Sequence, residues 1–242
     1  MADSGSQGGA SFEQTPWTLL GRLARGGEDD PSVAEELARR YWRPVVSYLH
    51  ALGVRHNEEA EEIAQDFFAR VVVGRRLFER AARERGTLRA LIKTALRRHL
   101  IDRAKSAGRG SGGCDPNLEI RSDDLSTQNG LFDRFDREWA AAQLFEAVRR
   151  AELHYAESGK PGHWAAFERF VYLPATRGAA RPTASSLAVE LGFESAPALT
   201  AAVQVVRTRV LVLLKVVVAE TVADPRDLEA EYDLLMRILG GL

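Results

Sequence analysis

One basic stretch organises this chain, and its centre reads Arg85-Gly-Thr-Leu-Arg-Ala-Leu-Ile-Lys-Thr-Ala-Leu-Arg-Arg-His-Leu-Ile-Asp-Arg103. Residues 70–109 around it hold thirteen basic and three acidic side chains, which is a net charge of +10. Its apolar residues recur with the 3.6-residue period of an α-helix. Arg89, Lys93 and Arg97 follow one another at intervals of four residues beside that apolar stripe. The pattern predicts a helix over residues 87–105 that packs by one face and presents a row of cations on the neighbouring face.

This cation row has two interpretations. A row of guanidinium and ammonium groups along a helix suits a phosphate backbone, because each contact releases condensed counterions. The alternative is an ordinary amphipathic helix whose arginines only face water. Charge alone does not decide between them.

An acidic segment lies just before the basic stretch. Residues 57–66 contain five carboxylates and no basic side chain, and Asn57 is the expected N-cap. The helix dipole stabilises carboxylates in a first turn, which accounts for Glu58 and Glu59 but not for those further along. The formal net charge of −1 therefore conceals two adjoining helices of opposite sign.

Length and composition indicate a soluble globular chain. It has 242 residues, 45% hydrophobic and 28% charged, enough for one large domain or two small ones. No apolar run reaches the ~20 residues that span a bilayer, and the polar residues 1–14 are neither a signal nor a transit peptide. We expect residues 1–14 to be disordered and no membrane to be involved.

Catalytic and metal-binding patterns are missing from the sequence. Cys114 is the only cysteine, which excludes a disulfide within the chain and a cysteine-based metal site, and a cytoplasmic location is the simplest inference. The five histidines show no metal-ligand spacing, and no phosphate-binding glycine loop or GxSxG motif occurs. We therefore expect no enzymatic activity, no small-molecule substrate, no metal and no cofactor.

Helical periodicity recurs along the whole chain and strand signals are absent, so the predicted fold is all-α. Residues 106–135 begin with a segment rich in Gly, Ser, Asp and Pro, and we interpret them as a flexible linker between helical domains at 15–105 and 136–242. Within the second domain, residues 182–214 have the layout of a helix-turn-helix, with Thr183 as N-cap and Gly192 at the turn. A last helix, over residues 225–239, is expected to pack on the second domain.

Three segments, in this order, resemble the extracytoplasmic-function class of bacterial RNA polymerase sigma factors. The first is similar to the first core helix of that family, the second to its acidic polymerase-binding segment, and the third to the region that recognises and melts the −10 promoter element. They are Leu37-Ala-Arg-Arg-Tyr-Trp-Arg-Pro-Val-Val-Ser-Tyr-Leu49, Glu58-Glu-Ala-Glu-Glu-Ile-Ala-Gln-Asp-Phe-Phe-Ala-Arg-Val71 and the basic stretch quoted above.

The resemblance implies a non-catalytic transcription initiation factor that binds core RNA polymerase and promoter DNA. It also allows an anti-sigma factor or another regulator as a partner. The implied polymerase contacts are Glu61, Glu62, Gln65, Asp66 and Arg70. The implied contacts with promoter DNA in the basic stretch are Arg89, Lys93, Arg97, Arg98, Arg103 and Lys105.

The second domain departs from the family pattern. In the family, the second helix of the helix-turn-helix carries basic residues that read the −35 element. Here the charges between residues 183 and 222 cancel, and a neutral helix gains little affinity from counterion release. Pro197 also disturbs the spacing. The remaining candidates for contacts with DNA bases or phosphates are Thr200, Gln204, Arg207 and Arg209.

Three functional hypotheses follow from the sequence. The first is a sigma factor that directs promoter-specific initiation. The second is a sigma-like regulatory or adaptor protein that binds polymerase or another protein without reading promoters, which the neutral helix-turn-helix favours. The third is a helical scaffold that binds nucleic acid non-specifically, with the strong salt dependence that such binding shows.

Overall fold

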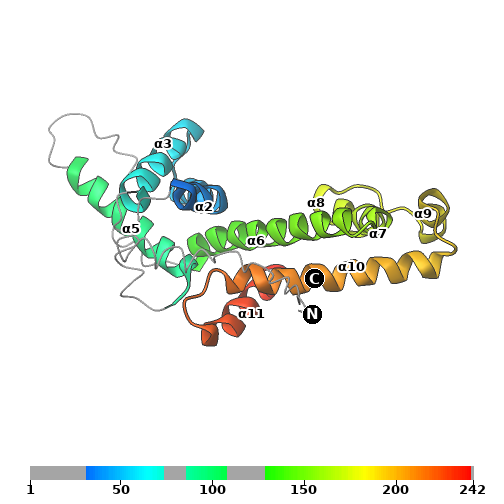
Figure 1. Ribbon diagram of the computed structural model, residues 1–242. Helices are drawn as coiled ribbons and strands as arrows, with labels where there is room; N and C mark the ends of the chain where they lie inside the picture. Colours follow the sequence, from blue (N-terminus) through cyan, green and yellow to red (C-terminus); the bar gives the residue numbers. More distant parts are fainter. Residues whose placement is uncertain (1–30, 74–85, 108–128, 241–242) are drawn as a thin grey trace, which may run out of the picture.

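A computed structural model describes residues 31–73, 86–107 and 129–240, and these residues are almost entirely helical (Figure 1). The described part contains no β-strand; its only β-type pairing is an isolated bridge between Thr87 and Val222. The all-α prediction is therefore confirmed for these residues. The predictions for residues 1–14, for the start of the first helical domain and for most of the linker fall outside the described residues.

The helices run through the described chain in the following order. They are α2 (Pro31–Ala51), α3 (Asn57–Phe67), η1 (Phe68–Val73), α5 (Leu88–Ala107), α6 (Asn129–Glu157), α7 (Pro161–Phe167), η2 (Glu168–Tyr172), α8 (Leu173–Arg177), α9 (Ala184–Leu191), α10 (Ala196–Ala219), η3 (Pro225–Asp227) and α11 (Leu228–Ile238).

The predicted acidic and basic helices correspond to α3 and α5. One detail differs, because the N-cap of α3 is His56 rather than Asn57, and its side chain makes no capping hydrogen bond. The Asn57 amide instead donates a 2.6 Å hydrogen bond to Glu61 Oε1 one turn later. Asn57 thus supports the first turn from within the helix.

A large apolar core gathers helices from both ends of the chain. Tyr41 of α2, Phe67 of α3, Leu96 of α5, Trp139 of α6 and Leu235 of α11 are all fully buried in it. Figure 1 shows α2, α3 and α5 at one end of the molecule, beside the start of α6 and the end of α10. The C-terminal residues therefore complete the core of the N-terminal helices.

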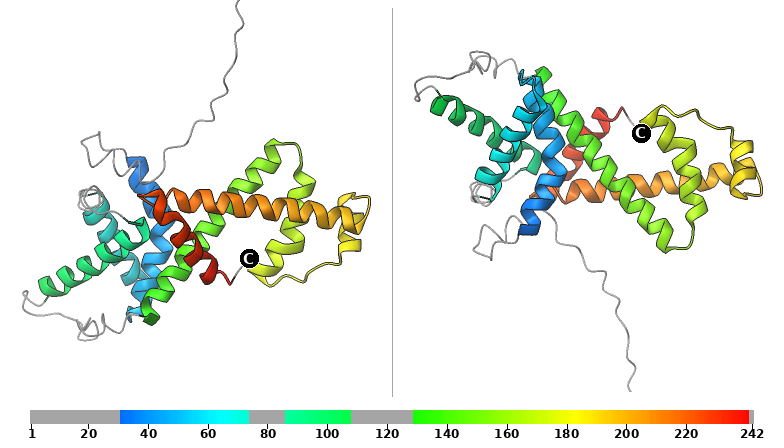
Figure 2. Two further views of the ribbon diagram at one scale, coloured as in Figure 1. Left: turned by 90° about the horizontal axis from the view of Figure 1, so that it is seen from below. Right: turned by 90° about the horizontal axis from the view of Figure 1, so that it is seen from above.

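A smaller core lies at the other end, where α7 and the first half of α10 pack on the second half of α6. Tyr155, Trp164, Leu187, Leu199 and Val206 are among its buried residues. Both cores share α6 and α10, which cross each other in the views of Figure 2. Burial is therefore continuous along the two longest helices.

This arrangement differs from the predicted division at residues 106–135. Phe135, which was assigned to the linker, is fully buried in the large core, and so are Val217 and Val218 of the predicted second domain. The last helix, α11, does pack on α10 and α6 of the predicted second domain, and its Leu235 also belongs to the large core shared with the N-terminal helices. Apolar periodicity located the helices correctly but does not specify which helices share a core.

The ends of α5 and α10 are joined through their backbones. Leu88 N donates to Thr221 O at 2.8 Å and Ala223 N donates to Gly86 O at 3.0 Å. Gly86 has a φ of 140°, a conformation that residues with a side chain rarely adopt. This pairing places the first turn of α5 beside the C-terminal segment.

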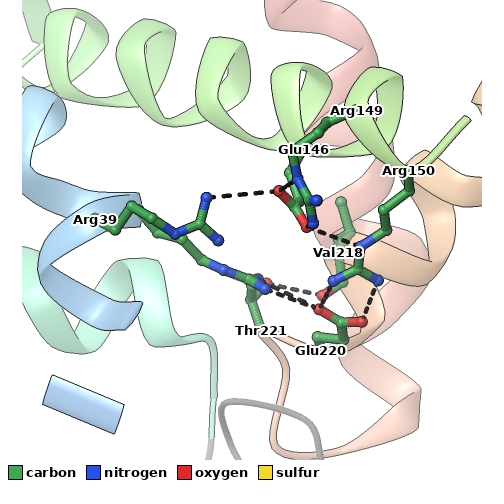
Figure 3. Close-up of polar contacts among 8 residues, drawn as sticks. Arg39, Glu146, Arg149, Arg150, Val218, Glu220 and Thr221 are labelled. Atoms are coloured by element: carbon green, nitrogen blue, oxygen red, sulfur yellow. Dashed lines mark hydrogen bonds and ion pairs between the residues drawn. The ribbon is translucent and has the colours of Figure 1, made fainter. Parts of the chain in front are cut away.

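A buried ionic network ties α2, α6 and the end of α10 together (Figure 3). Glu220 accepts hydrogen bonds from Arg150 at 2.6 and 2.9 Å and from Arg40 at 3.3 Å. Arg150 also donates to Glu146. Burial by itself raises the pKa of Glu146, but hydrogen bonds from Arg149 and Arg150 more than offset this and lower the pKa to about 2. Glu146 therefore stays ionised inside the protein.

We predict that Glu220→Gln destabilises the fold by about 3 kcal/mol, because it leaves two partly buried guanidinium groups without their shared anion. Denaturant unfolding of the purified chain measures this. The matched control is Glu190→Gln on α9, whose pair with Arg169 is exposed and is expected to contribute little. Equal effects of the two substitutions would contradict the network's role.

Candidate functional site

The first half of the basic helix α5 faces inward. Arg89 binds Glu231 of α11 in a two-pronged contact, with Nε 2.7 Å from Oε1 and Nη2 2.9 Å from Oε2, and its Nη1 donates to Asp136 of α6 at 3.0 Å. Lys93 Nζ lies 2.9 Å from both carboxylate oxygens of Asp136. The side chains of Arg89 and Lys93 are only 13% and 15% exposed. These two cations join three helices.

Aromatic rings complete the surroundings of these cations. The guanidinium carbon of Arg89 lies 5.2 Å from the ring centre of Trp139, and Lys93 Nζ lies 5.8 Å from that of Phe135. Burial acts to lower the pKa of both groups. For Arg89 the two carboxylates outweigh burial and raise the pKa, whereas for Lys93 burial prevails over Asp136 and the pKa is lowered.

The sequence prediction of a cation row presented along the whole of α5 is therefore wrong for Arg89 and Lys93. Its physical reason is that the chain supplies its own anions, Asp136 and Glu231, from helices that are distant in sequence. Neither carboxylate was among the predicted site residues. A signal did exist for Glu231, since it falls between Leu228 and Leu235 on the apolar face of α11, where a carboxylate needs a buried partner.

The second half of α5 keeps its cations closer to solvent. Arg98 and Lys105 are exposed and Arg97 is half-buried, and none of the three has an acidic partner among the described residues. Arg103 Nη2 lies 3.4 Å from Glu62 Oε1 of α3, in a contact that is open to solvent on both sides. Three of the six predicted DNA-binding cations of α5 are thus available on its outer half, and a fourth is weakly paired.

The acidic helix α3 turns a polar face outward and leaves none of its carboxylates fully buried. Glu58, Glu62 and Gln65 are exposed and Glu61 is half-buried, while the opposite face of α3 is part of the large core. Asp66 differs from these residues, because it pairs with Arg70 one turn later and lies 3.4 Å from His99 of α5. The structure therefore places Glu61, Glu62 and Gln65 on one face of α3. Asp66 and Arg70 form an ion pair with each other.

The residues of the predicted helix-turn-helix form two helices, α9 and α10, which are joined by a short turn. Thr183 caps α9 by accepting from Ser186 N, and Ser195 caps α10 by accepting from Ala198 N. Gly192 ends α9 with a left-handed φ of 74°, as glycine does in this position. Pro197 fits the first turn of α10, where a missing N–H is harmless. The local geometry follows the predicted caps, while a DNA-reading role remains a prediction.

The four predicted DNA contacts on α10 do not share one surface. Thr200, Gln204 and Arg207 line a groove against α7, η2 and α8. Arg209 lines a different groove, beside Lys160 at the turn between α6 and α7. The helical rotation of about 200° between positions 207 and 209 separates them.

Other kinds of site are not found in the described part of the chain. It contains no cluster of histidine, cysteine or carboxylate side chains that could hold a metal ion. None of its helices combines the length and the apolar character needed to cross a membrane.

Comparisons with protein-family models, with curated proteins and with solved structures found no match. The charged faces of α3 and α5 are the principal candidate site.

The two halves of α5 should respond differently to loss of charge. We predict that Arg89→Met lowers the free energy of unfolding by about 3 kcal/mol or more, because the 4%-exposed Glu231 then loses both of its hydrogen bonds. Arg98→Met, nine residues later on the exposed side, should leave stability nearly unchanged. Chemical denaturation of both variants tests the assignment, and a stable Arg89→Met protein would refute it.

Proposed function

We propose that this protein is an RNA polymerase sigma factor, or a close functional equivalent, that directs promoter-specific initiation. The observation that carries the proposal is the outward face of α3, formed by the exposed Glu58, Glu62 and Gln65 and the half-buried Glu61. This face lies on the helix that resembles the polymerase-binding segment of that family. Support also comes from the order of the three resembling segments along the chain. The protein would act in the cytoplasm, where polymerase works.

The proposed polymerase contact is electrostatic in its first stage. An acidic helix face accelerates encounter with a basic surface and sets the register of the complex. Ile63 and Phe67 are fully buried beneath that face, so the helix is held firmly by its own core. The proposed contacts are Glu61, Glu62 and Gln65, with Asp66 and Arg70 as a pair at the end of the helix. The acidic face is therefore carried on a helix that is already fixed by its core in the free protein.

The proposed DNA contact uses the outer half of α5. Arg97, Arg98 and Lys105, with Arg103 beside them, would bind phosphates of the promoter and of the displaced strand. The mechanism is positional: the factor orients polymerase on the promoter and supports strand opening, while polymerase makes the bonds. Arg89 and Lys93 support this surface from beneath, since they fix α5 to α6 and α11.

The polymerase contact is tested by reconstitution with core polymerase from the source organism. We predict that the double reversal Glu61→Lys and Glu62→Lys weakens binding by at least about tenfold, the size expected for about 1.4 kcal/mol. Glu152→Lys on α6, also an exposed carboxylate on a helix, is the control and should bind like the unmodified chain. No binding by the unmodified chain, or equal loss in the control, would reject the proposal.

A second candidate is a sigma-like adaptor that binds polymerase without reading promoters. It is favoured by the inward engagement of Arg89 and Lys93, which leaves fewer cations for DNA, and by the absence of net charge over residues 183–222. Under this candidate, α3 keeps its role and α5 is mainly structural.

Run-off transcription separates the two candidates. The sigma factor is expected to give transcripts whose length follows the promoter position. Arg98→Gln with Lys105→Gln should weaken promoter binding and reduce the dependence of log affinity on log salt by about 2, one for each lost phosphate contact. The control pair Lys160→Gln with Arg177→Gln removes two exposed cations, from the turn after α6 and from the end of α8 at the other end of the molecule, and should not change the slope. Polymerase binding without any promoter-dependent transcript would instead identify the adaptor.

A further inference from the structure

A groove with a volume of about 540 Å³ lies between α10 and the segment α7–η2–α8, which runs back across α10 in Figure 2. Its volume falls within the range of ordinary small-molecule sites. The groove lies at the end of the molecule away from the proposed polymerase and DNA surfaces of α3 and α5. The proposed polymerase and promoter contacts on α3 and α5 do not use it, although Thr200, Gln204 and Arg207 of its lining were predicted from the sequence as DNA contacts.

The floor and walls of this groove are apolar. Val148 of α6, Phe167 of α7 and Val203 and Val210 of α10 are buried side chains that form its floor. Phe170, Val171 and Leu211 are partly buried and form the walls. A hydrocarbon chain or an aromatic ring placed here would remove further apolar surface from water, and its affinity would come mainly from that burial.

The rim of the groove is positively charged. Arg207 of α10 and Arg181 of the loop before α9 both line it, and no carboxylate does. The guanidinium carbon of Arg181 lies 4.1 Å from the ring centre of Phe170, which holds it over the apolar wall. Neither arginine has an acidic partner among the described residues, in contrast to the neighbouring Arg169, which is paired with Glu190. Two unneutralised cations therefore stand at the mouth of an apolar groove.

We propose that this groove binds a small amphipathic anion, an organic acid with an alkyl or aryl body. The body would lie on Phe167, Val203 and Val210, and the acid group would bind Arg181 and Arg207 at the rim through charge-assisted hydrogen bonds. A nucleic acid backbone fits less well, because its phosphates and sugars would leave the apolar floor unused. Gln204, also on the lining, supplies a further donor for the acid group.

The test is a fluorescence titration of the full chain with 8-anilinonaphthalene-1-sulfonate, a small aryl acid, displaced by octanoate or by 1-octanol. Octanoate should displace the probe at much lower concentration than octanol, because only octanoate carries the acid group. The double substitution Arg181→Gln and Arg207→Gln should weaken octanoate binding by at least about tenfold.

Two further variants locate the site. Arg209→Gln removes a cation from the same helix but on the other groove, so it should leave octanoate affinity within about twofold of the unmodified chain. Ala175→Trp fills the groove from an exposed position of α8 and should abolish displacement without unfolding the protein.

The proposal is overturned if octanol and octanoate bind equally, if Arg209→Gln matches the double substitution, or if Ala175→Trp has no effect. It is also overturned if Arg181→Gln and Arg207→Gln reduce affinity for DNA but not for octanoate, since the groove would then serve nucleic acid. Polymerase binding by α3 does not enter these measurements, so failure here leaves the proposed function untouched.

Discussion

Two buried carboxylates in the C-terminal part of the chain, Glu220 and Glu231, form ion pairs that join the helices of the large core. Glu220 binds arginines of α2 and α6, and Glu231 binds Arg89 of α5. Moving such charges out of water is costly, so each is tolerated only because its partners are close and well aligned. These contacts fix the angles at which α2, α5 and α6 meet the C-terminal helices. The position of the charged surface of α5 depends on them.

The same contacts divide the basic helix into two parts with different tasks. Its first half joins α6 and α11, and its second half keeps cations at the surface next to the acidic face of α3. Some of the charge on the two helices is neutralised where they meet, through Glu62 with Arg103. Asp66 also lies 3.4 Å from the His99 ring, but burial lowers the pKa of His99 and so disfavours the charged imidazolium. The opposite charges of neighbouring helices thus contribute to packing as well as to the proposed binding of partners.

Local features were predictable from the sequence because they depend on neighbouring residues. Helical periodicity located α3 and α5, and the cap at Thr183 and the left-handed turn at Gly192 follow from residue type alone. Long-range pairing was not predictable in this way. The periodicity of α5 shows that one face is buried, but only the fold shows that Asp136 and Glu231 arrive at its edge.

The sequence predicted the outward face of α3 correctly but not the faces of α10. The face of α3 carries Glu61, Glu62 and Gln65 as expected, because outward residues of an amphipathic helix follow from its period. On α10, by contrast, Arg207 and Arg209 were grouped together although two residues along a helix place them on different grooves. A composition argument counts charges, whereas binding depends on the face that each charge occupies.

Native-state hydrogen exchange of the full chain tests most directly whether the C-terminal segment is part of the core of the N-terminal helices. Because Glu220 and Glu231 join α2, α5 and α6 to the C-terminal helices, the slowest amides of α2, α5 and α11 should exchange with the same free energy of opening. Exchange of α11 that is orders of magnitude faster, while α2 and α5 stay protected, would contradict this account.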